Sequence, residues 1–247
     1  MPVYGMAEAT LAISFTPLMQ PSVITAFDSK ILDVEMQAVE IPESHENARI
    51  LSAVGIALND VDIRITGNND QPLPEGQAGN IQLRGAGITS GYYKKPEATR
   101  EAFCGNWLRT GDIGFFYKGN LYVSGRKKDI IFKNGRNYFA NDLEIMACTL
   151  EDVSYGKVCF GGTTNRETGH EKVIAFLAGS PGEKANETFR QMRNLLRANL
   201  GITPDELVMV KSNEIPKTSS GKLQRYKLMQ RYLAGEFNGS IIYPDNI

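Results

Sequence analysis

GRKKDIIFKNG, residues 125–135, divides the sequence into two parts that differ in their pattern of polar and apolar residues. It opens with the charged residues 126–129, continues with the apolar residues 130–132 and ends in the turn-forming triplet Lys133, Asn134 and Gly135. Short segments of alternating polar and apolar residues precede it, whereas long helical patterns follow it. Because no linker rich in Pro, Gly and Ser competes with this boundary, we predict a β-rich first half and an α+β second half.

The first half contains the signals of an antiparallel sheet or barrel. Residues 61–65 and 80–83 alternate between apolar and polar side chains, and the residues between them include Gly67, Asn68, Asn69, Asp70 and Pro72. The same β pattern continues at 107–108, 115–117 and 121–123, with Gly119-Asn120 as the expected hairpin turn and a short helix at 96–103. Residues 20–47 have Pro21, Pro42 and a polar cluster at 43–47, and we expect an irregular, exposed excursion there.

The second half combines helices with strands. Residues 183–200 carry apolar side chains on one face and end before Gly201, which predicts a helix with a glycine C-cap. Asn141 is the expected N-cap of an earlier helix. We predict strands at 157–160, 173–177 and 207–210, and a final amphipathic helix at 222–233.

Composition excludes several classes of protein. The chain has 247 residues, 42% of them hydrophobic and 22% charged, and a net charge of -1, which gives no argument for a nucleic-acid or anionic-membrane partner. There is neither an apolar run long enough to cross a membrane nor a signal-peptide layout, so we expect a cytoplasmic protein. Three scattered cysteines indicate reduced thiols, and two isolated histidines argue against a histidine metal centre or a Ser-His-Asp hydrolase.

PKTSSGKLQR, residues 216–225, places a lysine after a glycine in a run of small polar residues. It is not a Walker phosphate loop, because Pro216 stands where the first glycine is needed and Leu223 where a Ser or Thr is needed. What remains is a loop that presents Lys222 beside hydroxyl groups at Thr218, Ser219 and Ser220. An ordinary solvated loop lysine is the alternative interpretation.

Four motifs in order along the chain favour a functional role for Lys222 over that alternative. They are YGMAE at 4–8, GYY at 91–93 with WLRTGD at 107–112, GRKKD at 125–129 with KNG at 133–135, and PKTSSGKLQR at 216–225. Together they resemble the adenylate-forming superfamily of acyl-CoA synthetases, adenylation domains and luciferases. The resemblance implies an α+β protein: residues 1–125 as part of a large domain that ends in a distorted antiparallel β-barrel, a hinge at 126–128, and a small mobile α+β domain at 129–247.

The resemblance also implies a catalytic role for Lys222. In this family an anionic carboxylate must approach the α-phosphate of ATP, and a cation between the two like charges lowers the barrier. Lys222 matches the family's adenylation lysine, and a flexible loop with a long ammonium side chain suits that role. Withdrawal of Lys222 after adenylation would then open the site for attack by a thiol.

Further residues match the family's nucleotide site. Asp112 matches the aspartate that accepts hydrogen bonds from the ribose hydroxyl groups, and Arg126 resembles a second ribose contact. Tyr4 matches the aromatic residue beside the adenine, with Gly5, Met6 and Ala7 in the same nucleotide-binding motif. The alternatives are a helix-cap or turn aspartate for Asp112, a solvated arginine for Arg126 and a core tyrosine for Tyr4.

Two more positions match a metal ligand and the hinge residue of the family. Glu8 matches the ligand of a magnesium ion that bridges phosphates, where a hard oxygen suits a hard cation. A glutamate favoured at a helix N-terminus is the alternative. Lys128 falls at the hinge, where backbone torsion lets the small domain swing.

Within the family, the chain looks most similar to fatty acyl-AMP ligases and the acyl-ligase loading domains of polyketide and peptide synthetases. Ala7 replaces the usual threonine before the glutamate, and the excursion through residues 23–47 resembles an insertion that disfavours the coenzyme A conformation. The acyl-adenylate of a fatty or other carboxylic acid would then pass to the phosphopantetheine thiol of an acyl or peptidyl carrier protein. An acyl-CoA synthetase, an amino-acid adenylation domain and a non-catalytic carrier-docking module are the alternatives. Ala140, where Pro is common, leaves the next helix start open.

One expected part of the family is missing from the sequence. The Ser/Thr/Gly-rich phosphate loop and most of the acyl tunnel precede the Tyr-Gly motif in the family, and this sequence starts at that motif. We therefore expect the chain to correspond to the C-terminal portion of such an enzyme and to be inactive alone.

Overall fold

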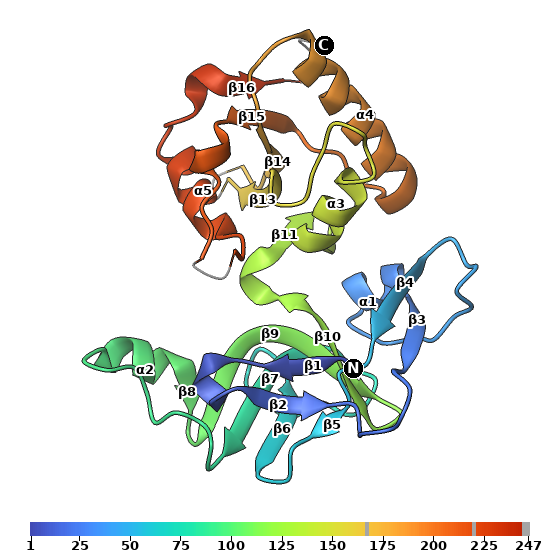
Figure 1. The fold of residues 1–247 in the computed structure, drawn as a ribbon, viewed down its shortest axis with the longest axis vertical. Coiled ribbons are helices and arrows are strands. Elements are labelled where there is room, and N and C mark those ends of the chain that lie inside the picture. The colour runs from blue at the N-terminus through green and yellow to red at the C-terminus, as the bar shows by residue number, and fades with distance from the viewer. Residues whose placement is uncertain (166–167, 219–220, 244–247) are drawn as a thin grey trace. The chain divides into compact units, whose positions relative to one another are not determined.

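A computed structural model describes residues 1–165, 168–218 and 221–243 (Figure 1). The chain forms two compact units, Met1–Lys127 and Lys128–Ile247. The hinge at residues 126–128 stays a prediction. Ser219 and Ser220, two of the hydroxyl-bearing loop residues, lie outside the described residues.

The first unit is built on a curled antiparallel sheet. Its strands run in the order β10-β9-β7-β6, and the pair β6 and β7 confirms the antiparallel strands expected from the alternating pattern. The bounds are β6 (Val61–Thr66), β7 (Gly79–Gly85), β9 (Trp107–Tyr117) and β10 (Asn120–Arg126), with the short β8 (Phe103–Cys104) beside β9. The strand order is open, so the sheet is a half-barrel, which Figure 1 shows in the curve of β9. The helix α2 (Pro96–Ala102) has Pro96 at its start, as expected.

A smaller sheet contains the start of the YGMAE motif, residues 4–8. It joins β1 (Val3–Gly5), β2 (Ala12–Phe15) and β5 (Ile56–Ala57), and a single 3-10 turn, Ala7–Ala9, connects β1 to β2. The buried Ile13 of this sheet packs with apolar residues of the curled sheet in one hydrophobic core. That core fixes the position of β1 against β9.

The prediction of an irregular excursion at residues 20–47 is wrong for residues 24–34, which form a strand and a helix. The chain forms β3 (Ile24–Asp28), α1 (Ser29–Val34) and β4 (Ala48–Ser52), and the Asp28 carboxylate caps α1 by accepting hydrogen bonds from two backbone N–H groups. Phe27 is fully buried and meets Phe115 and Tyr122 edge to face. Residues 20–24 and 42–46 are exposed, as expected.

The hairpin between β9 and β10 turns one residue earlier than expected. Asn120 pairs with Tyr117, so the two turn residues are Lys118 and Gly119, with φ of 48° and 74°. A two-residue hairpin of this kind requires positive φ at both positions, and glycine accepts it at no steric cost. The prediction of Gly119-Asn120 as the turn is therefore wrong by one position.

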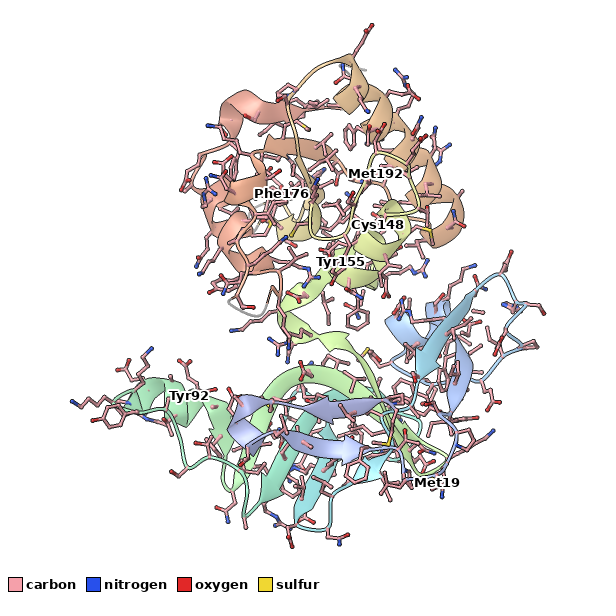
Figure 2. The ribbon with its side chains drawn as sticks, in the orientation of Figure 1. Met19, Tyr92, Cys148, Tyr155, Phe176 and Met192 are labelled. Carbon is pink, nitrogen blue, oxygen red and sulfur yellow. The ribbon has the colours of Figure 1, made fainter. Side chains whose placement is uncertain are left out.

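The second unit is a sheet covered by helices on both faces. The strands β13 (Val158–Thr164), β14 (Glu171–Ala178), β15 (Glu206–Val210) and β16 (Ile241–Ile242) lie in that order, and β14 and β15 are parallel. Helices α3 (Ala140–Ala147) and α4 (Glu183–Leu200) cover one face, and α5 (Arg225–Leu233) covers the other. Met192 of α4 and Phe176 of β14, both labelled in Figure 2, belong to these two separate cores. A hairpin of β11 (Ile130–Lys133) and β12 (Arg136–Phe139) precedes α3.

Helix boundaries in this unit follow the predictions with two exceptions. The bounds of α4 and the left-handed C-cap at Gly201, with φ of 71°, are confirmed. Helix α3 begins at Ala140 with Phe139 at the N-cap, so Asn141 is not the cap. Helix α5 begins at Arg225, because the backbone before it is held in a closed loop, so Lys222 lies in that loop rather than in the helix. In the described part of the chain, no helix combines the length and apolar character needed to cross a membrane.

Candidate functional site

Tyr4, Asp112 and Arg126 form a polar cluster in the first unit. The Tyr4 hydroxyl donates a hydrogen bond of 2.6 Å to Oδ2 of Asp112, and Nε of Arg126 lies 3.2 Å from Oδ1 of the same carboxylate. The register of β9 and β10 pairs Asp112 with Arg126, just past a bulge between Val123 and Gly125. Three residues predicted for the nucleotide site are therefore in direct contact.

Burial differs strongly within this cluster. The Asp112 side chain is 8% exposed, whereas that of Arg126 is 63% exposed. Burial, reinforced by the negative charge of Asp112, raises the pKa of Tyr4 far above its usual range, so its hydroxyl remains a hydrogen-bond donor. The cluster thus places a buried carboxylate beneath a solvent-facing guanidinium.

Thr110 adds a contact that was not assigned from the sequence. Its hydroxyl donates to the Ile81 carbonyl at 2.9 Å and accepts the backbone N–H of Asp112 at 3.0 Å. Thr110 therefore orients the backbone that carries Asp112. Its signal was its place in the WLRTGD motif.

The rest of the first motif follows directly after Tyr4. A β-carbon on Gly5 would lie 1.9 Å from the carbonyl oxygen of Leu11, so only glycine fits this close approach. Met6 is half-buried against the core around Ile13, and Ala7 is exposed. The nucleotide-binding roles of Gly5, Met6 and Ala7 stay predictions.

Glu8 is paired with an aromatic hydroxyl. The Tyr92 hydroxyl donates to Oε1 of Glu8 at 2.9 Å, and the Glu8 carbonyl accepts the backbone N–H of Thr89 at 2.7 Å. Burial and the neighbouring Glu8 raise the pKa of Tyr92, which keeps it a donor (Figure 2 labels Tyr92). The sequence singled out Tyr92 only as part of a motif and missed that it orients Glu8.

A half-buried carboxylate oriented in this way fits the oxygen preference of Mg²⁺. Within the described ranges, no group of three or more His, Cys, Asp or Glu side chains is arranged to hold a metal ion. The role of Glu8 in metal binding stays a prediction.

Lys222 lies in a closed loop of the second unit. Its backbone N–H donates to the Thr218 hydroxyl at 3.0 Å, and its carbonyl accepts the Thr218 N–H at 2.8 Å. Lys217 and Leu223 form an isolated antiparallel bridge, and Gln224 N–H donates to the Pro216 carbonyl. The loop is therefore a small hairpin, and the Lys222 side chain at its end is exposed.

The remaining predicted position is Lys128. It is the first residue of the second unit and lies exposed in the 3-10 turn Lys127–Asp129. The Tyr4 cluster and Glu8 belong to the first unit, and Lys222 belongs to the second.

The chain is similar over nearly its whole length to several known proteins. The chain is 35% identical over 236 residues to a provisionally named acyl-CoA synthetase of Caulobacter vibrioides, matching 95% of this chain and 41% of that protein. It is 29% identical to the long-chain-fatty-acid--AMP ligase FadD32 of Mycobacterium marinum, matching 98% of this chain and 45% of the ligase. No protein-family model matches the chain.

Solved structures of adenylate-forming proteins also match the chain over nearly its whole length. A fatty acyl-adenylate ligase structure from work on the E. coli and L. pneumophila proteins matches with a TM-score of 0.83 and 28% identity, over 95% of this chain and 42% of that chain. The keto acid-selecting module of a nonribosomal peptide synthetase, solved with its adenylation domain, also matches with a TM-score of 0.83 and 28% identity, over 96% of this chain and 20% of that chain.

The fold and the order of the motifs are similar to those of the fatty acyl-AMP ligases and acyl-CoA synthetases among these relatives. The chain belongs to the adenylate-forming superfamily, whose members here include fatty acyl-AMP ligases, acyl-CoA synthetases and adenylation domains of peptide synthetases. It spans about two fifths of the length of the first relatives that it matches.

Proposed function

We propose that this chain supplies two parts of an acyl-adenylating active site: the ribose-binding cluster of Tyr4, Asp112 and Arg126, and the cation Lys222. The observation that carries the proposal is the buried Asp112 carboxylate, held from one side by the Tyr4 hydroxyl and from the other by Arg126. An ionised carboxylate only accepts hydrogen bonds and has about four acceptor positions. Two neighbouring ribose hydroxyl groups are donors that suit it.

The reaction follows from the charges that must meet. A carboxylate oxygen of the substrate bonds to the α-phosphorus of ATP, pyrophosphate leaves, and an acyl-adenylate forms. Lys222 would stand beside the two anions and lower their repulsion, since a cation at short range in a partly dry site is worth a few kcal/mol. A thiol would then attack the acyl carbonyl and release AMP.

Magnesium, when bound, would neutralise charge on the phosphates. Glu8 would hold it, with Tyr92 fixing the orientation of the Glu8 carboxylate. Tyr92→Phe should therefore weaken metal-dependent binding of the nucleotide while leaving metal-free binding of AMP unchanged.

The substrate that we propose is a fatty acid, and the acceptor is the phosphopantetheine thiol of a carrier protein. The long-chain-fatty-acid--AMP ligases and the fatty acyl-adenylate ligase structure among the relatives support this choice. The acyl-CoA synthetase at 35% identity supports coenzyme A as the rival acceptor. Supplying both thiols to a preformed acyl-adenylate and measuring which is acylated distinguishes them.

The ribose cluster can be tested on the chain itself. Titration of AMP into the ¹⁵N-labelled protein should shift the amide signals of Tyr4, Asp112 and Arg126, and analogues lacking the ribose hydroxyl groups should shift them less. Asp112→Asn should abolish the response. Asp62→Asn is the matched control, because Asp62 also pairs with an arginine, Arg84, but is 59% exposed on the sheet. An equal response in Asp112→Asn and wild type contradicts the assignment.

Lys222 is tested in a chimera. The matched region of the Caulobacter relative is replaced by this chain, and fatty-acid-dependent exchange of pyrophosphate into ATP is measured. Lys222→Ala should lower the exchange rate by about a hundredfold or more, whereas Lys217→Ala, in the same hairpin, should leave it within a few fold. The 247-residue chain alone should show no exchange; robust exchange would refute the proposal that it supplies only part of the site.

A further inference from the structure

Arg225 joins three segments of the second unit through one guanidinium group. Its Nη1 donates to Oδ2 of Asp129 at 2.7 Å, and its Nε and Nη2 donate to the two oxygens of Glu144 at 2.8 and 2.6 Å. Arg225 is the first residue of α5, Glu144 lies in α3, and Asp129 ends the 3-10 turn that contains Lys128. The guanidinium therefore links the end of the lysine loop to the residue that follows the predicted hinge position.

The two carboxylates differ in burial. Glu144 is fully buried and also accepts the backbone N–H of Phe160 at 3.2 Å, while the Asp129 side chain is 22% exposed. The Arg225 side chain is 12% exposed. Removing one partner of a buried pair leaves an unpaired charge and destabilises the fold. The Glu144 contact thus anchors Arg225 in the core, and the Asp129 contact extends from that anchor toward the turn.

Backbone contacts hold the lysine loop at its stem. Its stem is closed by the bridge between Lys217 and Leu223 and by the hydrogen bond from Gln224 to Pro216. Two residues separate Lys222 from Arg225, so their Cα atoms lie at most about 11 Å apart. The position of Lys222 therefore depends on where the stem is fixed, and Arg225 is the fixed end.

We propose that Arg225 is a positioning residue, which holds the Lys222 loop to the turn after Lys128 through its bond to Asp129. This inference rests on the proposed role of Lys222. If backbone torsion at Lys128 reorients the second unit, the stem of the loop moves together with the first residues of that unit. The planar guanidinium of an arginine suits this task because it donates to two carboxylates at once in a fixed geometry. A lysine ammonium at the end of a flexible stem lacks that fixed geometry.

The test measures order in the loop rather than activity. Hydrogen exchange of the backbone N–H groups of Thr218, Gly221, Lys222 and Gln224 is followed by NMR in the 247-residue chain. Asp129→Ala should speed their exchange by about tenfold or more, and exchange in the strands β13 to β15 should stay within about twofold. Asp129→Asn, which keeps a hydrogen-bond acceptor for Nη1, should restore most of the protection.

Glu236→Ala is the matched control. Arg231, also in α5, bridges Glu236 and Glu214 as Arg225 bridges its two carboxylates. This variant removes the arm to Glu236 and keeps the arm to Glu214, which lies two residues before Pro216. Its loop exchange should equal that of the wild type. Equal loop exchange in Asp129→Ala and Glu236→Ala overturns the inference, and so does a uniform rise over the whole second unit, which would show a purely structural role. Because no turnover is measured, loss of the proposed function leaves this result unaffected.

Discussion

Replacing Tyr4 with Phe should destabilise the first unit by removing one hydrogen bond and little else. The ring stays in place, so no cavity forms, but the 2.6 Å bond to Oδ2 of Asp112 is lost. A hydrogen bond to a charged group contributes about 1.5–3 kcal/mol, whereas one between neutral groups contributes about 0.5–1.5 kcal/mol. Asp112 is buried, so water does not readily replace the lost donor.

The chain contains its own probe for this measurement. Trp107 is its single tryptophan and lies in the first unit, so its fluorescence during urea unfolding reports on that unit. Tyr122→Phe is the matched control, because the buried Tyr122 hydroxyl bonds to the neutral Thr25 hydroxyl at 2.9 Å. We expect Tyr4→Phe to lower the free energy of unfolding by about 1 kcal/mol more than Tyr122→Phe does.

The pH dependence separates this bond from a packing effect. The folded-state pKa of Tyr4 is raised by burial and by Asp112, so its contribution is fully present below the unfolded-state pKa of about 10 and is lost as pH rises further. The difference in stability between wild type and Tyr4→Phe should therefore narrow between about pH 10 and pH 11. A constant difference over that range, or a cost no greater than that of Tyr122→Phe, refutes the reasoning.

Three further predictions concern both units. Arg109, with Gln82, lowers the pKa of Asp70 to about 2, so its contribution is present above about pH 4 and is lost as pH falls toward 2; Asp70→Asn should flatten the acid dependence of unfolding followed by Trp107 fluorescence. Phe189→Ala, at a fully buried position of α4, should cost about 3–5 kcal/mol in denaturant unfolding followed by circular dichroism. Burial raises the pKa of the Cys159 thiol, so at pH 8 iodoacetamide should label the half-buried Cys104 and Cys148 before Cys159, as read by mass spectrometry.

Local patterns were sufficient where an element carries its own boundaries. The helix α4 has a continuous apolar face and a glycine directly after it, and both of its ends were predicted. The strand β3 and the helix α1 within the excursion were missed because Phe27 becomes a core residue only through Phe115 and Tyr122, which lie far along the chain. No periodicity within residues 20–47 carries that information.

The candidate site depends on distant residues in the same way. Tyr4 and Asp112 are 108 positions apart, and only the family resemblance placed both at one nucleotide. Their direct contact came from the structure, as did the pairing of Glu8 with Tyr92 and of Arg225 with Asp129 and Glu144. Residue types and spacing identify candidates, but the partner of each side chain is set by strand register and packing.

Two buried carboxylates paired with arginine show how burial separates a binding group from a structural one. Glu144 is fully buried and its partner Arg225 is only 12% exposed, so a ligand would have to displace a guanidinium from the core to reach it. Asp112 is almost as buried, but its partner Arg126 is 63% exposed and can turn toward a ligand at little cost in desolvation. Burying a carboxylate costs desolvation free energy. Where its arginine partner faces solvent, a ligand rich in hydrogen-bond donors can reach the carboxylate and offset that cost. A carboxylate paired with an arginine therefore supports a different proposal in each unit: ribose binding for Asp112 with Arg126, and positioning of the lysine loop for Glu144 with Arg225.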